Sequence, residues 1–307
     1  MRILLTGGAG FIGSHVAEHL LQRGHEVAII DNLSTGNREN VPREAAFCEA
    51  DIRSAKDVEE VFARFEPEVL SHQAAQMDVR RSVAEPGFDA EVNIVGTLRL
   101  LEGCVRHGVS KVVFASTGGA IYGEQQQFPA PEDHPQYPLS PYGVSKLAGE
   151  RYLHFYCEQY GLPYTVLRYA NVYGPRQDPH GEAGVVAIFC GNLAAGDASR
   201  INGSGEQTRD YTYVGDVARA NVLAVEGESP AGAYNIGTAV ETSVNRLYDL
   251  LQNVSGKDLL PQHGPAKPGE QLRSSVDSSS AARVFGWRPQ VALEEGLRET
   301  FWSFETS

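Results

Sequence analysis

The 307-residue chain lacks any apolar run of the roughly 20 residues that a membrane-spanning helix requires. It opens directly on a short apolar segment, RILLT, rather than on a basic leader with a small-residue cleavage site. These features argue against an embedded helical membrane protein. We expect a cytoplasmic protein that has no membrane partner.

Cysteine is scarce, and the four residues Cys48, Cys104, Cys157 and Cys190 form no C-x-x-C pair. Without such a pair, the zinc-finger pattern of cysteine and histidine pairs is missing as well. We therefore expect no disulfide framework and no metal site. The cysteines are interpreted as small buried hydrophobic residues.

Basic residues are in deficit, with 26 Lys and Arg against 39 Asp and Glu and a formal net charge of −13 at pH 7. This balance argues against a protein that wraps nucleic acid, because phosphate backbones are bound by basic surfaces. Small anionic ligands stay possible, since a few local cations and backbone amides can hold them. Repeats and low-complexity segments are absent from the sequence.

Short apolar runs alternate with helical periodicity through the first half of the chain. Ile12, Val16 and Leu20 recur at four-residue intervals, and Gly24 suits the end of that helix. The predicted strands are 2–6, 25–30, 68–75, 111–117 and 164–170, and the further helices are 58–65, 88–107 and 143–160. This alternation predicts an α/β fold: a Rossmann-like doubly wound parallel sheet with a smaller C-terminal α/β substrate domain.

Three glycines, Gly7, Gly10 and Gly13, stand three residues apart between the first strand and the first helix. Glycines at such a turn permit close backbone approach, and the helix N-terminus offers amides to a pyrophosphate. Asp31 ends the second strand, where a carboxylate can bond the adenosine ribose hydroxyls and repel a 2′-phosphate. The set predicts NAD as cofactor. A plain turn and a solvated strand-end acid are the alternatives.

The texture of the sequence changes near residue 171, where loops rich in Gly, Pro, Asp and Asn begin. We therefore expect residues 1–170 to form an NAD-binding Rossmann domain. Residues 171–307 would mainly form the substrate domain, with segments around 211–237 returning to the first domain.

The segment SPYGVSK places Tyr142 and Lys146 four residues apart, on one face of the predicted helix 143–160. A free tyrosine titrates at about 10 and is a poor base at neutral pH. A lysine ammonium and a positive nicotinamide ring would lower the pKa of Tyr142 by stabilising its phenolate. We predict that these two residues form a catalytic pair.

Motifs along nearly the whole chain resemble one family. They are TGGAGFIG, DNLSTG, HQAA, NIVGT, STGGAIYG, SPYGVSK, LRYANVYGPRQ, RDYTYVGDV, YNIG and GWRP. On these motifs the chain resembles the extended short-chain dehydrogenase/reductase family and, within it, the UDP-glucose 4-epimerases. The resemblance implies an NAD cofactor, a UDP-sugar substrate and a homodimer formed through the helices around 88–107 and 143–160.

The resemblance also implies a set of cofactor contacts spread over the sheet edge. They are Gly7, Gly10, Phe11, Ile12, Gly13, Asp31, Asn32, Asp51, Ile52, Ala74, Ala75, Asn93, Tyr142 and Lys146. Met77 departs from the family, because many bacterial epimerases have a cofactor-contacting lysine there. The departure concerns how firmly the cofactor is held, not which cofactor it is.

The family places a hydroxyl residue against the 4-hydroxyl of the sugar. Counting from the strand puts Thr117 there, whereas counting back from Tyr122 puts Gly118 there, because STGGAIYG carries one extra residue. We predict Thr117, since glycine has no hydroxyl. The alternative is that Ser116, the residue before it, is simply a hydroxyl at the end of the strand.

Substrate contacts implied by the resemblance lie in the second half of the chain. Asn171 would contact the diphosphate or sugar, and Arg209 would pair with the diphosphate unless it bridges to Asp210. The family's late R-x-G-D segment is K-P-G-E here, so Lys267 and Glu270 would contact the UDP. Arg273 would compensate for the weaker lysine. Ser274, a small residue at a gating position, would let N-acetylated sugars enter; a plain loop serine is the alternative.

The implied reaction is 4-epimerisation of UDP-hexoses, with Tyr142 as general base and Thr117 assisting. Dehydratases and decarboxylases of the family need a carboxylate directly after the catalytic threonine, and this chain has Gly118 and Gly119. A one-way reductase is disfavoured by Asp31. A non-catalytic NAD-binding protein is disfavoured because Thr117, Tyr142 and Lys146 are all present. The alternative is another NAD-dependent nucleotide-sugar epimerase, reductase or dehydratase of the same family.

Overall fold

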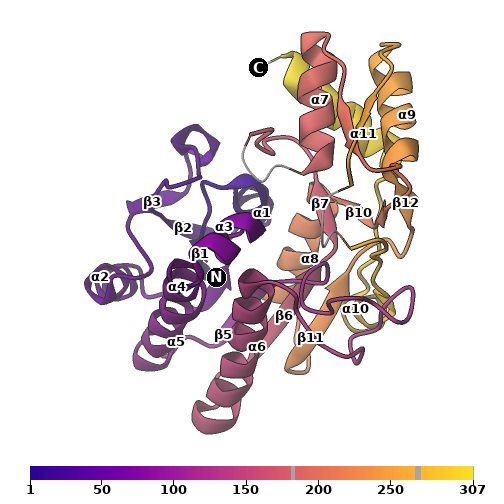
Figure 1. Ribbon diagram of the computed structural model, residues 1–307. Coiled ribbons are helices and arrows are strands. Elements are labelled where there is room, and N and C mark those ends of the chain that lie inside the picture. Colours follow the sequence, from indigo (N-terminus) through magenta and orange to yellow (C-terminus); the bar gives the residue numbers. More distant parts are fainter. Residues whose placement is uncertain (181–183, 267–270, 307) are drawn as a thin grey trace.

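A seven-stranded parallel sheet forms the centre of the computed structural model, which describes residues 1–180, 184–266 and 271–306 (Figure 1). Neighbouring strands pair in the order β11-β6-β5-β4-β1-β2-β3, all parallel. The strands are β1 (Arg2–Thr6), β2 (Glu26–Asp31), β3 (Ala46–Glu49), β4 (Val69–His72), β5 (Lys111–Thr117), β6 (Tyr164–Tyr169) and β11 (Gly232–Ile236). The predicted doubly wound sheet is confirmed. Its strand order reverses between β1 and β4, and such sheets bind ligands at that point.

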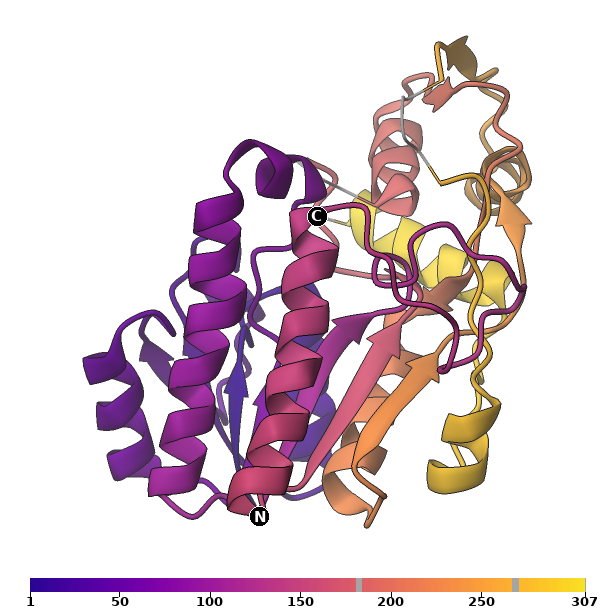
Figure 2. The ribbon, with the colours of Figure 1, turned by 60° about the horizontal axis from the view of Figure 1, so that its bottom comes forward.

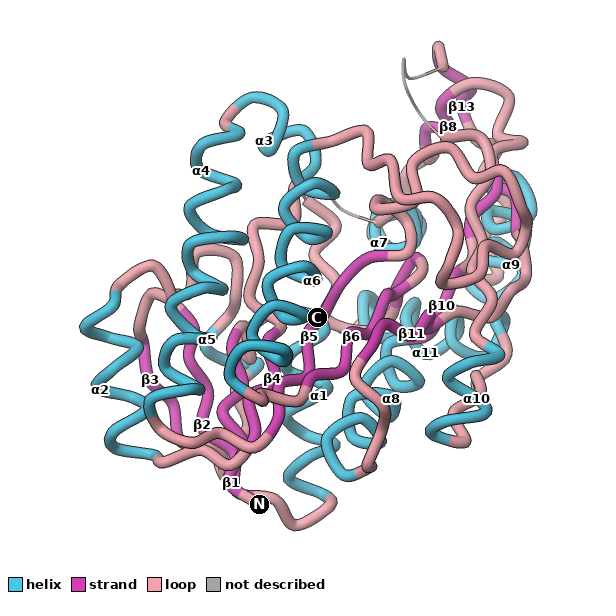
Figure 3. Tube along the Cα trace, turned by 90° about the horizontal axis from the view of Figure 1, so that it is seen from below, coloured by secondary structure: helices cyan, strands magenta, loops and turns pink. Residues whose placement is uncertain are grey.

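Helices cover both faces of the sheet (Figure 3). One face carries α1 (Phe11–Gln22) and α8 (Val214–Glu226); the other carries α2 (Ala55–Phe65), α5 (Thr97–Arg106) and α6 (Pro141–Tyr160). In β1, Ile3 and Leu5 belong to the first core and Leu4 to the second, and all three are fully buried. Strands buried on both faces are continuous apolar runs, which explains why RILLT shows no alternation.

The helix predicted at 88–107 is divided in the structure. It consists of α4 (Pro86–Ala90), a π-helical turn η2 (Glu91–Gly96) and α5, with α3 (Val79–Ala84) before them. These segments pack beside α6, and the two long helical runs lie next to each other in Figure 2. The strand predicted at 68–75 is shorter, ending at His72. The chain then turns toward β1, where the Ala74 amide donates to Thr6 Oγ1 at 3.1 Å.

The second half of the chain forms a smaller α/β unit beyond the carboxyl ends of β5 and β6 (Figure 1). Its helices α7 (Val185–Ala195), α9 (Val244–Ser255) and α11 (Leu293–Glu305) share one core. Short strands pair within it: β7 (Asn171–Tyr173) with β10 (Tyr211–Tyr213), β9 (Thr208–Arg209) with β12 (Thr242–Ser243), and β8 (Arg200–Asn202) with β13 (Gln262–Gly264). Outside this core, α10 (Ser279–Phe285) packs on β11, and η1 (Arg38–Asn40) is a short turn after β2.

Two segments near 211–237 join the first half of the molecule. β11 pairs with β6 at the edge of the large sheet, and α8 packs against α1. The smaller unit is therefore joined to the large sheet through β11 and α8.

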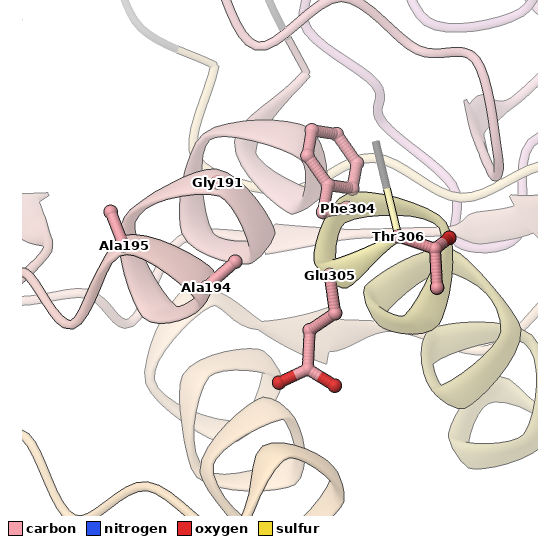
Figure 4. A pocket seen from close by; sticks show the side chains of 6 residues that line it. All are labelled: Gly191, Ala194, Ala195, Phe304, Glu305 and Thr306. Atoms are coloured by element: carbon pink, nitrogen blue, oxygen red, sulfur yellow. The ribbon is translucent and has the colours of Figure 1, made fainter.

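A surface pocket lies between α7 and α11 (Figure 4). Its lining consists of Gly191, Ala194, Ala195, Phe304, Glu305 and Thr306. None of these is a predicted site residue. Within the described part of the chain, no helix has the length and apolar character needed to cross a membrane.

Candidate active site

The glycine corner joins β1 to α1 in a very tight space. Gly7 has φ +71°, and a Cβ there would lie 2.7 Å from the backbone nitrogen of Ala74. A Cβ on Gly13 would lie 2.1 Å from the Gly7 carbonyl oxygen. Side chains are therefore excluded at both positions, and the first turn of α1 comes close to the ends of β1 and β4.

The first turn of α1 is suited to a pyrophosphate. Gly10 is its N-cap and carries no side chain over the helix end, and the first turn contains no acidic residue. Phe11 and Ile12 therefore present backbone amides at the positive end of the helix dipole. This cradle at the β1–β4 reversal fits a dinucleotide, as the glycine spacing predicts.

Asp31 is buried at the end of β2 and holds this corner together. Its two carboxylate oxygens accept the amides of Ala9 at 3.0 Å and of Leu33 at 2.9 Å. A carboxylate offers about four acceptor positions, so both oxygens retain capacity for ribose hydroxyls. A solvated strand-end acid, the alternative interpretation, does not match this burial.

Asp51 follows β3 and is paired within the protein. It accepts hydrogen bonds from the Arg53 guanidinium, as close as 2.6 Å, and from Asn32 Nδ2 at 3.1 Å. The Arg53 bonds lower the pKa of Asp51 to about 2. Ile52 is buried, and a Cβ on Gly96 would lie 2.8 Å from its Cδ1. These residues form one cluster beside the end of β2.

Asn93 is buried in η2, and protein groups occupy its amide. Its Nδ2 donates to Gln76 O at 2.9 Å, Asp89 Oδ1 at 3.0 Å and Ser145 Oγ at 3.1 Å, and its Oδ1 accepts the Gln76 amide. Ala74 and Ala75 are half-buried in the same loop, and Met77 is exposed. Asn93 therefore links this loop to α6 through its hydrogen bonds.

The predicted catalytic pair lies in the first turns of α6. Ser140 caps this helix by accepting the Gly143 amide, and Pro141 occupies its first position. Tyr142 and Lys146 thus lie one turn apart. The Lys146 ammonium is buried, donates to Ala115 O at 2.9 Å and lies 4.9 Å from the centre of the Phe114 ring.

Burial dominates the titration of this pair. It lowers the pKa of Lys146 to about 8, with Asp89 and Glu150 opposing the shift. In the protein alone, burial raises the pKa of Tyr142, and the charges of Asp89 and Tyr169 raise it further. The predicted lowering of the Tyr142 pKa needs the nicotinamide ring as well as Lys146, so it stays a prediction for the cofactor-bound protein.

Thr117 ends β5 at the same sheet edge. Its Oγ1 and Asn171 Oδ1 each lie 3.8 Å from the position of a Cβ on Gly119, so the two side chains converge on one space. Ser116 is different, because its hydroxyl is buried and donates to Glu150 at 2.5 Å. Gly118 has no room, since a Cβ there would lie 2.8 Å from Val276. The geometry favours Thr117 over both competitors.

Arg209 lies in β9 and is half-buried, with Nη1 donating to Thr208 O at 2.8 Å. The neighbouring Asp210 carboxylate is buried and accepts hydrogen bonds from Thr238, Ala239 and Val276. Burial raises the pKa of Asp210, and these donors oppose the shift.

The late substrate segment is only partly described. Lys267 and Glu270 lie outside the described residues. Arg273 is exposed, pairs with both oxygens of Glu241 and lies 3.9 Å from the Phe128 ring centre. Its charge is therefore already engaged. Ser274 is 3% exposed, so it is not a surface loop serine.

Histidines at positions 15 and 19 lie four residues apart on α1, a spacing that can serve metal ions. The ring of His15 contacts Pro175 O at 3.0 Å, and that of His19 contacts the His15 carbonyl at 2.9 Å. Among the described residues, no group of three His, Cys, Asp or Glu side chains could hold a metal.

Two buried acidic residues near the predicted site, Asp89 and Glu150, were not predicted from the sequence. Asp89 is 1% exposed and lies beside the predicted catalytic pair, and Glu150 binds Arg168 through a buried, bidentate ion pair. The available signal was helical spacing: Asp89 is four residues before Asn93, and Glu150 four residues after Lys146. Acidic residues at such spacing also occur on solvated helix faces, so the spacing alone does not indicate that Asp89 and Glu150 are buried.

Together, the glycine corner, Asp31 and the Tyr–Lys pair define a dinucleotide-binding α/β protein of the short-chain dehydrogenase/reductase type. The chain belongs to the NAD dependent epimerase/dehydratase family, whose sequence model matches residues 3–237.

Individual relatives resemble the chain over nearly its full length. The UDP-glucose 4-epimerase of Mycolicibacterium smegmatis is 47% identical over 308 residues, covering 98% of this chain and 97% of the relative. A Thermotoga maritima UDP-glucose 4-epimerase structure with UDP-glucose has a TM-score of 0.97 at 50% identity, covering 100% and 99% of the two chains. A Thermus thermophilus UDP-glucose 4-epimerase in complex with NAD has a TM-score of 0.93 at 48% identity, covering 99% of each. The resemblance drawn from the motifs is thereby confirmed.

Proposed function

We propose that the protein catalyses the NAD-dependent interconversion of UDP-glucose and UDP-galactose by epimerisation at C4. The observation that carries this proposal is the shared sheet edge, where Thr117 on β5 and Tyr142 and Lys146 on α6 accompany the glycine corner. The three relatives described above, each a UDP-glucose 4-epimerase at 47–50% identity, support the substrate class.

Each step is assigned to a side chain. Tyr142 removes the proton of the sugar 4-hydroxyl, and Thr117 hydrogen-bonds that oxygen. Lys146 keeps a positive charge beside the phenolate. Gly7, Gly10, Gly13 and Asp31 would hold NAD, and the bound cofactor would supply the reversible acceptance of hydride from C4. Tyr142 then gives its proton back to the 4-keto oxygen after the sugar has presented its other face.

The diphosphate must stay anchored while the sugar turns. Arg209 suits this task, because a guanidinium can form two parallel bonds to phosphate oxygens. Asn171 lies across from Thr117, as judged from their common distance to Gly119. We assign the diphosphate to Arg209, and the sugar or the adjoining phosphate to Asn171. Lys267 and Glu270 complete the proposed UDP contacts, and Arg273 would join them by exchanging its ion pair with Glu241 for the UDP.

Other activities of the family are less well supplied. A dehydratase or decarboxylase needs a carboxylate after Thr117, where Gly118 packs on Val276 and Gly119 has no side chain. A reductase would use NADPH more readily, and Asp31 opposes a 2′-phosphate.

The proposal is tested by incubating the purified protein with UDP-glucose, first without added cofactor and then with NAD. Proton NMR of the anomeric region follows the sugars. We expect UDP-galactose to form. No conversion in the presence of NAD would overturn the proposal for this sugar pair, and other nucleotide sugars would be tried next.

We also propose that UDP-GlcNAc and UDP-GalNAc are substrates. The small side chain of Ser274 supports this breadth, because a bulky residue at the family's gating position restricts the pocket to plain hexoses. Comparing the two substrates in the same NMR assay measures the breadth directly.

A homodimer and a cytoplasmic location belong to the same proposal. The outer face of α6 exposes Tyr152, Phe155 and Tyr160, and Val95 and Val105 are exposed on the adjacent helices. Such an apolar patch suits a helix-to-helix interface. The four cysteines of the chain are free, as is usual in a reducing compartment. Light scattering of Phe155→Asp against the parent chain tests the dimer, and we expect monomers for the variant.

A further inference from the structure

A buried carboxylate that the proposed mechanism does not use lies behind the catalytic helix. Asp89, in α4, is 1% exposed, and α4 packs on α6. Its Oδ1 accepts Gln76 Nε2 at 3.1 Å and Asn93 Nδ2 at 3.0 Å. Both donors are neutral amides. Burying an ionised carboxylate is costly without close charge compensation, so its presence here calls for a reason.

Asp89 is connected to both halves of the cofactor and catalytic region. Asn93 Nδ2, which donates to Asp89, also donates to Ser145 Oγ at 3.1 Å, and Ser145 Oγ donates to the Tyr142 carbonyl at 2.9 Å. On the other side, Gln76 belongs to the loop that carries Ala74 and is bonded to Asn93 through its main chain. One carboxylate thus fixes the loop before α3 and the first turn of α6.

The charge of Asp89 also acts on the reactive groups themselves. It raises the pKa of Lys146, against burial, and it raises the pKa of Tyr142 together with burial. Other groups face the pair: Glu150 acts on Lys146 and Tyr169 on Tyr142, while the buried His72 ring feels the Lys146 charge.

An epimerase makes an unusual demand on its base. The same tyrosine must remove a proton and then return it, so neither its protonated nor its ionised form can be strongly favoured. The Lys146 ammonium and a bound nicotinamide ring both favour the phenolate. A fixed negative charge nearby opposes them and also keeps a buried lysine protonated.

We propose that Asp89 is a positioning residue for the reaction at Tyr142. Its buried carboxylate holds the first turn of α6 in place through Asn93 and Ser145, and it sets a negative charge behind the Tyr142–Lys146 pair. The inference rests on the proposed epimerisation.

The decisive variant is Asp89→Asn, which keeps the size of the side chain and removes its charge. The pH dependence of kcat/KM for UDP-glucose is measured on the NAD-loaded protein. Removing a negative charge lowers the pKa of both neighbours, so both limbs of the profile should move to lower pH by about one unit. Glu91→Gln is the matched control, because Glu91 is an exposed carboxylate two residues away. We expect its profile to match that of the parent protein.

A folded Asp89→Asn protein whose profile keeps its position and loses only amplitude would overturn the proposal. Should Asp89→Asn fail to fold, Asp89→Ser gives the same test, and failure of both to fold would establish a purely structural role.

A second readout separates this inference from the proposed function. The tyrosinate absorbance that is lost in Tyr142→Phe should appear at lower pH in the Asp89→Asn background than in the parent, with NAD bound. If the parent does not epimerise UDP-glucose but this ionisation shifts, the function fails and the positioning role stands. If the parent is active and the ionisation does not shift, the positioning role fails alone.

Discussion

The two sides of the proposed active site are built differently. On the cofactor side, Asp31 is buried at the end of β2 and Asn93 is buried within η2, and protein groups already bond their polar atoms. On the substrate side, Arg209 lies on a two-residue strand and Arg273 is exposed. The cofactor side is therefore formed in advance by the sheet, whereas the substrate side depends on short segments from the second half of the chain.

This difference follows from the order of the chain. The cofactor side uses consecutive βα units, whose strand ends meet at one edge because the sheet is parallel. The substrate side joins β9 to β12 and brings residues near 130 beside those near 276, across long separations. Substitutions on the cofactor side should therefore affect folding and cofactor binding together, and those on the substrate side should affect substrate binding alone.

The largest effect is expected where the two sides meet, at Tyr142. Tyr142→Phe removes the proposed base and leaves the ring in place, so kcat should fall by about 10²–10⁴-fold with little change in thermal stability. The NMR epimerisation assay and a melting curve measure both. Tyr160→Phe, at an exposed tyrosine on the same helix, is the control. Retention of more than half the parent kcat in Tyr142→Phe would remove this residue from the mechanism.

At the glycine corner we expect a strong effect on stability and cofactor binding, in contrast to the effect on kcat alone at Tyr142. Gly13→Ala would place a Cβ 2.1 Å from the Gly7 oxygen, so the corner must open at a cost of about 3 kcal/mol. Unfolding free energy and NAD affinity should fall together, as urea melts and cofactor titration would show. Gly87→Ala is the matched control, because nothing lies within 4 Å of its added Cβ. Unchanged NAD binding in Gly13→Ala would contradict a preformed cofactor side.

The same contrast explains what could be predicted from the sequence. The sheet and the glycine corner follow from local patterns, since buried parallel strands and a G-x-x-G-x-x-G turn are short-range signals. The π-helical turn at 91–96 could not be predicted, because Asn93 within it bonds to Gln76 and Ser145, which lie 17 and 52 residues away in the sequence. Asp89 escaped for a related reason: its burial depends on α4 packing against α6.

The substrate side shows the limit more clearly. Arg273 was predicted to compensate for the weaker lysine at 267, yet it pairs with Glu241, 32 residues earlier in the sequence. No local pattern reports such a partner. The roles of Thr117, Asn171 and Arg209 came from the family resemblance, and they stay predictions until their variants are measured.

A smaller and selective effect is expected on the substrate side, at Arg209. Arg209→Lys keeps the charge and removes the forked geometry, so affinity for UDP should fall about tenfold while NAD affinity is unchanged. Calorimetric titration with each ligand separates the two. Arg246→Lys, at an exposed arginine in the same half of the chain, should change neither affinity. If Arg209→Lys weakened NAD binding as much as UDP binding, the two sides would not be independent.

The last expected effect concerns selectivity between substrates rather than rate. Ser274→Tyr adds a ring at a position that is 3% exposed, so the ring must enter neighbouring space. If that space is the sugar pocket, activity toward UDP-GlcNAc should fall relative to UDP-glucose by about tenfold or more, the usual discrimination of a steric pocket wall. Ser274→Ala, which removes only the hydroxyl, should keep the parent ratio. A ratio unchanged in Ser274→Tyr, together with a lowered melting temperature, would mean that the ring has entered the core and that Ser274 does not gate the sugar. Ser274 would then contribute to folding, as the residues of the cofactor side do. At this position the two sides of the site would no longer differ in how a substitution acts.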